Sequence, residues 1–161
     1  MSSVTGSVYL HCPLERVIAY LHEGFAAIAS TGPRRQELRA RVPVAGIELS
    51  KAVLIGCMPL DDTSGRWVVT WEPESGGIYP TFEGELSARE HHKGETVLEL
   101  DGEYTPPLGS AGAMFDKLLG HRLATDTAQE FLMELAAEMR ARYAHEQALL
   151  AFGHPPDAPP A

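Results

Sequence analysis

The last third of the sequence joins an alternating strand to one long helix, and this pairing constrains the fold more than any other feature. Residues 97–104 alternate apolar with charged or small side chains, a pattern typical of a strand. Pro106 and Pro107 end this strand, because proline cannot donate a hydrogen bond to a sheet ladder. An apolar stripe at helical spacing then predicts one helix to about Gln147. A helix of this length needs a large apolar surface on which to pack, and we expect the preceding sheet to supply it.

The rest of the chain predicts a first strand, two short helices and a run of antiparallel strands. The first strand covers residues 6–11, and Pro13 opens a helix that Gly24 is expected to end. A second short helical piece covers residues 25–29, before a Gly-Pro break. From residue 34 to residue 104, apolar side chains recur at every second position between polar turns. One apolar face and one charged face on each strand indicate an antiparallel sheet covered on one side only.

Length and charge limit the classes of protein to which the chain can belong. Its 161 residues suit one domain, expected over residues 1–148, with a disordered proline-rich tail over residues 149–161. The formal net charge of −9 disfavours binding to nucleic acid or to anionic lipid. No apolar run approaches the ~20 residues that span a membrane, and the N-terminus lacks a signal peptide pattern. We therefore expect a cytoplasmic protein, either a monomer or a weak homodimer.

Sequence motifs give little support for metal or nucleophilic chemistry. The two cysteines, Cys12 and Cys57, lack CxxC spacing and are expected to be buried free thiols. The seven histidines form no zinc motif. His91 and His92 are adjacent in a polar loop, and neighbouring side chains on an extended chain point apart. There is also no GxSxG motif and no phosphate-binding loop. We expect no metal and no cofactor.

The apolar face of the sheet and the long helix should converge on one space. Its side chains are the candidate ligand-binding residues Trp67, Trp71, Phe82, Leu98, Leu100, Tyr104, Phe115, Leu119 and Phe131. This space could be a dry, filled core or a partly open cavity lined by aromatic side chains. Gly84 and Gly102 favour the cavity, because an inward-facing glycine contributes no side chain. Tyr104, or an indole nitrogen of one of the two tryptophans, could then orient a ligand.

The order of these elements resembles the helix-grip fold of the START-like, or SRPBCC, superfamily. The resemblance covers about Ser7 to Tyr143. Its most specific parts are residues 100–109, which look like the final strand and the Pro/Gly loop, and residues 115–124, which look like the start of the terminal helix. It implies an α+β fold in which a curved antiparallel sheet of six to seven strands wraps around a long C-terminal helix, with two short helices after strand 1. The superfamily includes polyketide cyclases and small carriers of hydrophobic ligands, and it has no shared catalytic set.

Two functions follow as expectations, with a third less specific one. The first is binding of a hydrophobic or aromatic small molecule between sheet and helix, so that Gly84→Leu or Gly102→Leu should abolish ligand uptake more than folding. The alternative is a cyclase or aromatase that uses Tyr104, His121 or Arg122 for proton transfer. The alternating acidic residues of the strands fit a solvated sheet face better than a catalytic pair. A protein partner on the sheet edge or on the acidic face is the third possibility.

Overall fold

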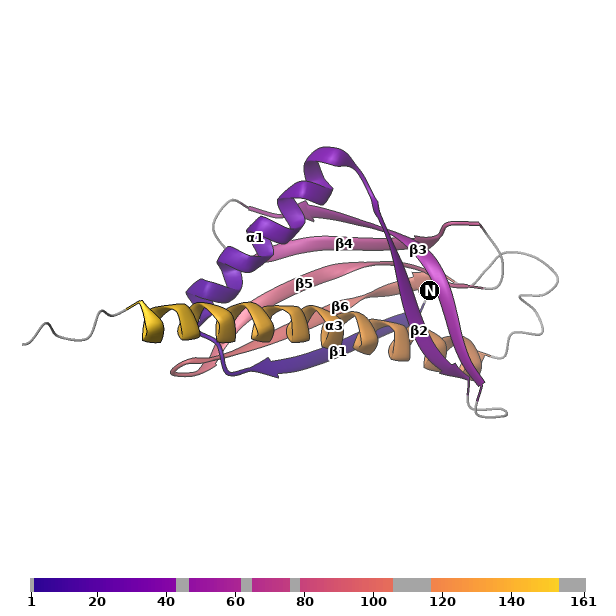
Figure 1. The fold of residues 1–161 in the computed structure, drawn as a ribbon. Coiled ribbons are helices and arrows are strands. Elements are labelled where there is room, and N and C mark those ends of the chain that lie inside the picture. Colours follow the sequence, from indigo (N-terminus) through magenta and orange to yellow (C-terminus); the bar gives the residue numbers. More distant parts are fainter. Residues whose placement is uncertain (1, 43–46, 62–64, 76–78, 106–116, 154–161) are drawn as a thin grey trace, which may run out of the picture.

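Six antiparallel strands curl around a long C-terminal helix in the computed structural model of the chain (Figure 1). The structure describes residues 2–42, 47–61, 65–75, 79–105 and 117–153. Within these residues the architecture is the predicted α+β helix-grip, with a half-barrel of strands closed by the helix. The polar turns that separate the alternating strands place successive strands side by side, as expected for antiparallel pairing.

All strand pairings within the described residues are antiparallel, and the spatial order is β1-β6-β5-β4-β3-β2. The first two strands of the sequence therefore lie at opposite edges of the sheet, and the helix between them connects the two edges. The strands are β1 (Ser2–Leu10), β2 (Arg34–Val42), β3 (Ile47–Pro59), β4 (Arg66–Pro73), β5 (Thr81–His92) and β6 (Glu95–Thr105).

One continuous helix, α1 (Leu14–Thr31), follows β1, so the prediction of two short helices is matched only in part. Gly24 lies inside this helix with no atom near its would-be side chain. A glycine costs a helix only about 1 kcal/mol relative to alanine. The buried residues Leu21, Phe25 and Ile28 continue the apolar stripe across it and offset that cost. The helix ends at Gly32, whose positive φ of 96° suits glycine, and β2 begins two residues later.

The terminal helix, α3 (Lys117–Phe152), is longer than predicted and packs against both edge strands, β1 and β2. It continues five residues past Gln147, while residues 154–161, where most of the expected tail falls, lie outside the described residues. Gly6 lets the helix approach β1 closely, because a Cβ atom there would lie 3.1 Å from Leu132 Cδ1. The helix thus bridges the two edges of the curled sheet.

The structure bears on two of the predictions about the chemical character of the chain, those for the cysteines and for membrane spans. Cys12 and Cys57 are free and buried, as predicted. None of the helices within the described residues combines the length and the apolar character that a membrane span requires. The expectations of a cytoplasmic location, of no nucleic acid partner and of a monomer or weak homodimer stay predictions.

Candidate functional site

Most of the predicted ligand-binding residues lie together beneath the sheet, but they pack against one another. The buried members are Trp67, Trp71, Phe82, Leu98, Leu100, Tyr104 and Phe131. Phe115 lies outside the described residues, and Leu119 belongs to α3 without a described side chain. The rings of Trp71 and Phe82 stack with centroids 4.0 Å apart, and the ring of Phe131 lies 5.8 Å from that of Trp71. The centre of this group is therefore a filled core.

The two glycines that were expected to leave room for a ligand instead make room for Phe82. Gly84 and Gly102 are directly opposite each other in the β5–β6 pair. A Cβ atom at either position would lie 2.5 to 2.7 Å from Phe82 Cζ. The expectation that their missing side chains open a cavity was wrong, because an aromatic ring from the same strand occupies the space.

An apolar pocket lies beside this core, where α1, α3, β2 and β3 meet. Its volume is about 270 Å³. The walls are apolar side chains from three of these elements: Phe25, Ile28, Ile55, Phe131 and Leu135. The two helices that supply walls, α1 and α3, diverge from one shared end (Figure 1).

Polar side chains form the rim of this pocket and connect β2 to α3. Arg34 donates a hydrogen bond to Gln36 Oε1 at 3.0 Å, and Gln36 Nε2 donates to Glu134 Oε2 at 2.6 Å. Glu138 completes the rim one helical turn further along α3. An apolar chamber with a few polar groups at its mouth is the usual form of a small-molecule site. We call these residues and the five wall residues the rimmed pocket.

The sequence identified Phe131 as a site residue but not the other wall residues of the rimmed pocket. Phe25 and Ile28 occupy neighbouring positions on the apolar face of α1, and this pattern was the available signal. Both tryptophans lie directly behind the walls. The ring of Trp67 contacts Phe25 edge-on with centroids 5.2 Å apart, and Trp71 lies next to Phe131. Their fluorescence can therefore report on an occupied pocket.

A larger hollow of about 470 Å³ lies on the outer side of the sheet, but its chemistry differs. Apart from Trp71 and Phe82, its lining comes mainly from outward positions of β3 to β6, including Glu72, Glu83 and Glu103. These carboxylates are exposed, and Glu83 and Glu103 are directly opposite each other. An acidic, solvated surface is unsuited to an apolar ligand. The smaller rimmed pocket is the better candidate site.

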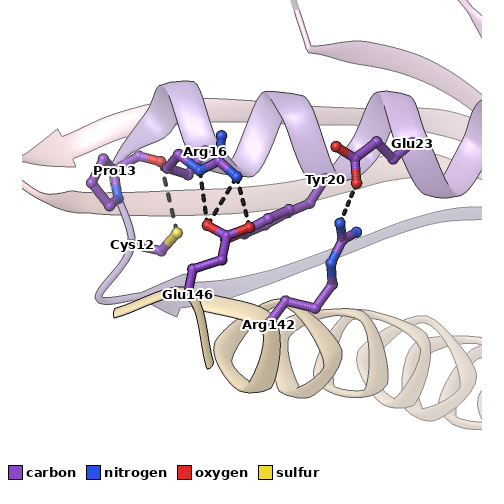
Figure 2. A network of polar contacts seen from close by, with 7 residues as sticks. All are labelled: Cys12, Pro13, Arg16, Tyr20, Glu23, Arg142 and Glu146. Carbon is purple, nitrogen blue, oxygen red and sulfur yellow. Dashed lines mark hydrogen bonds and ion pairs between the residues drawn. The ribbon is translucent and has the colours of Figure 1, made fainter. Parts of the chain in front are cut away.

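A polar network ties the start of α1 to the end of α3 and so fixes the closed end of the helix pair (Figure 2). Glu146 accepts hydrogen bonds from Arg16 at 2.8 Å and from the Tyr20 hydroxyl at 2.7 Å. The guanidinium groups of Arg16 and Arg142 lie over the Tyr20 ring, 5.0 and 4.4 Å from its centroid, and Arg142 also pairs with Glu23. The Tyr20 hydroxyl and then the Arg16 guanidinium hold the pKa of Glu146 below its ordinary value.

The residues proposed for proton transfer are only partly brought together. Tyr104 is buried, and the ring of His121 lies 6.3 Å from its ring. The side chains of His121 and Arg122 are exposed on α3. None of these three residues lines the rimmed pocket.

A different tyrosine, Tyr79, makes a buried polar contact with α3. Tyr79 is 1% exposed, and its hydroxyl lies 2.6 Å from Thr127 Oγ1 on α3. Thr127 gives its own hydrogen to the carbonyl of Leu123, so Tyr79 is the donor. Burial raises the pKa of Tyr79 to about 12, which keeps the phenol protonated. The sequence did not reveal this contact, because it joins two residues 48 positions apart.

Known proteins resemble this chain in structure rather than in sequence. No protein family model matches the sequence. No curated protein matches it either. Several solved structures share the fold, among them the protein TTHA0849 from Thermus thermophilus, which is 19% identical with a TM-score of 0.57. That match covers 88% of this chain and 99% of the other.

Two further structures extend this likeness to other bacteria. A conserved protein from Geobacillus kaustophilus is 14% identical with a TM-score of 0.55, over 87% of this chain and 96% of its own. The Zhui aromatase/cyclase from Streptomyces sp. R1128 is 13% identical with a TM-score of 0.56, over 88% of this chain and 95% of its own. At these identities the likeness establishes a shared fold and nothing about the reaction.

Proposed function

We propose that this chain, which has the helix-grip fold of the START-like, or SRPBCC, superfamily, binds a small hydrophobic or aromatic molecule in the rimmed pocket. The observation that carries the proposal is the apolar pocket itself, which has walls from α1, α3 and β3 and a polar rim from β2 and α3. Its volume of about 270 Å³ is near the lower end of small-molecule sites, which favours a ligand of one or two rings.

The binding free energy of such a ligand should come mainly from contact with the apolar walls, and the polar rim should set the orientation of the ligand. Burial of apolar surface yields roughly 25 cal/mol per Å², against which the cost of association must be set. Arg34, Glu134 and Glu138 at the opening favour a ligand with one polar end that stays at the rim. An apolar body and a polar tip would therefore bind in one orientation.

Titration with the fluorescent two-ring compound 2-naphthol, which has an apolar body and one polar end, tests the proposal. Leu135→Trp fills the pocket from α3, and Ile28→Trp fills it from α1, so each should weaken probe binding at least tenfold. Met133→Trp is the matched control, because Met133 lies on the same helix, is 52% exposed and lies outside the pocket lining. Urea unfolding of each variant verifies that it folds. Probe binding that survives both filled variants, or is lost equally in the control, would contradict the proposal.

An enzymatic role is the second candidate, and one contact favours it. Tyr104 and His121 are neighbours, and the Zhui aromatase/cyclase shares the fold. A turnover assay with a poly-β-ketone substrate tests this role, with Tyr104→Phe and His121→Gln as the variants. Turnover that both variants abolish would support an enzyme, and absence of turnover by the parent would leave binding as the function.

A further inference from the structure

The tip of the β5–β6 hairpin brings together two histidines and a glutamate that belong neither to the polar network nor to the rimmed pocket. The sequence predicted that the adjacent His91 and His92 point apart. Instead, their ring centroids are 4.2 Å apart. The reason is a bulge, since Glu90 pairs with Thr96 and His92 pairs with Glu95, which leaves His91 as an extra residue. A bulge changes the direction of the side chains along its strand. Here it interrupts the regular alternation from which we predicted that the two histidines point apart.

The third group reaches the same spot because the hairpin loop is short. Only Lys93 and Gly94 separate β5 from β6, and the positive φ of Gly94, 80°, suits a tight turn. This turn places Glu95 directly opposite His92. One ligand atom from each of His91, His92 and Glu95 lies within 4.8 Å of the others. Two imidazoles and one carboxylate form a set that zinc accepts.

Neighbouring residues support two members of the set. His11 Nδ1 lies 2.9 Å from Glu95 Oε1, which fixes this carboxylate and leaves its second oxygen available. The ring of Tyr9, on β1, lies 4.8 Å from the ring of His91. Metal-binding carboxylates commonly have such an outer hydrogen-bond partner. The two histidines are exposed, so small rotations can bring their nitrogens to the bond length of about 2.0–2.1 Å.

We propose that His91, His92 and Glu95 form a surface site for a borderline divalent transition-metal ion such as zinc, with His11 as the positioning residue of Glu95. Imidazole and carboxylate ligands favour zinc or nickel over magnesium and calcium, which prefer oxygen ligands alone. Three protein ligands leave at least one coordination position for water or another ligand. Because His11 belongs to the segment between β1 and α1, the bound ion also strengthens the contact of the hairpin with that segment.

Calorimetric titration of the untagged full chain with zinc chloride tests the site. The parent should bind one zinc ion at this site, and His92→Ala and Glu95→Gln should each weaken binding at least tenfold. His11→Ala should weaken it about tenfold, the lower end of the effect of outer partners. His145→Ala is the matched control, since His145 is an exposed histidine on α3 and should leave the affinity unchanged.

Nuclear magnetic resonance of the imidazole nitrogens provides a second measurement that does not depend on the variants. Added zinc should shift the ring nitrogens of His91 and His92 and leave those of His145 in place. A parent chain that binds no zinc at 1 mM would overturn the proposal. So would an affinity that falls as much in His145→Ala as in His92→Ala.

Discussion

Gly84 and Gly102 lie directly across from each other on β5 and β6, and the ring of Phe82 lies against both. The contact depends on the absence of a side chain at each position. It also holds Phe82 flat against Trp71, with 14° between the ring planes. The glycine pair is therefore a requirement of the core rather than a gap in it.

Gly102→Ala should destabilise the fold. The new Cβ atom would lie 2.4 Å from the Glu83 carbonyl oxygen and 2.5 Å from Gly84 Cα, and neither backbone atom can move aside cheaply. Overpacking of this kind costs typically 1–3 kcal/mol, measured here as a lower urea midpoint. Gly24→Ala is the control, because its Cβ would meet nothing within 4 Å in α1, and it should stabilise the protein by roughly 0.5–1 kcal/mol. Equal stability of Gly102→Ala and the parent would refute this account.

Two substitutions at the Tyr79–Thr127 contact should have unequal effects. Tyr79→Phe removes the donor and leaves Thr127 bonded to the Leu123 carbonyl, so the free energy of unfolding should fall by about 1 kcal/mol. Thr127→Val keeps the shape but leaves the buried Tyr79 hydroxyl without this acceptor, which should cost about 1–3 kcal/mol. Urea denaturation of both variants decides the order. A larger loss in Tyr79→Phe would mean that Tyr79 is not the donor.

Stability should depend on pH through Glu146. Because its folded pKa is lowered, chiefly by the Tyr20 hydroxyl, the carboxylate stabilises the fold fully above its ordinary value of 4.5. This contribution is lost as the pH falls through the lowered value. Glu146→Gln should thus be less stable than the parent at pH 7, and the difference should shrink as the pH falls below about 5 and through the lowered pKa. Denaturation midpoints across this range measure it.

The control for that experiment is Glu138→Gln. Glu138 lies on the same helix and is exposed, and it forms no ion pair with any residue that the structure describes. Its difference from the parent should not follow the acid profile of Glu146→Gln. A constant difference between Glu146→Gln and the parent at every pH would show that the ionised carboxylate has no stabilising role.

Both thiols should be unreactive in the folded protein. Burial raises the pKa of Cys57 to about 12 and also raises that of Cys12. At pH 8 the Cys57 thiolate fraction is then on the order of 10⁻⁴, and the thiolate is the reactive form. Ellman's reagent should modify neither thiol in buffer and both in urea. In Met58→Cys, a neighbouring position that is 67% exposed, the reagent should react at once. Rapid reaction of the folded parent would contradict the burial.

The sheet and its buried face could be predicted because each strand carries its pattern locally. Alternation alone placed Trp67, Trp71 and Leu100 on the buried side, and all three are buried. The continuity of α1 could not be predicted from local signals such as Gly24, which suggested a helix end. Packing of the apolar residues on both sides of Gly24 outweighs the low helix propensity of glycine. The order of elements was enough to indicate the helix-grip architecture, which the structure confirms.

The candidate sites were harder to predict because they depend on contacts between distant segments. The rimmed pocket joins Ile28, Ile55 and Leu135, and no local pattern relates these positions. The direction of the Phe82 ring follows from a glycine two residues along and another on the facing strand. The histidine pair depends on a one-residue register shift, which a sequence does not display.

The two-residue connection between α1 and β2 limits how a ligand can enter the rimmed pocket. Gly32 and Pro33 alone join the two elements, and the ring of Pro33 restricts the backbone between them. We therefore expect helix and strand to move together beside the rimmed pocket. A ligand too wide for the pocket must therefore displace α3, whose C-terminal part is held to α1 by the hydrogen bonds of Glu146. We expect the ligand to exchange faster when these hydrogen bonds are weakened.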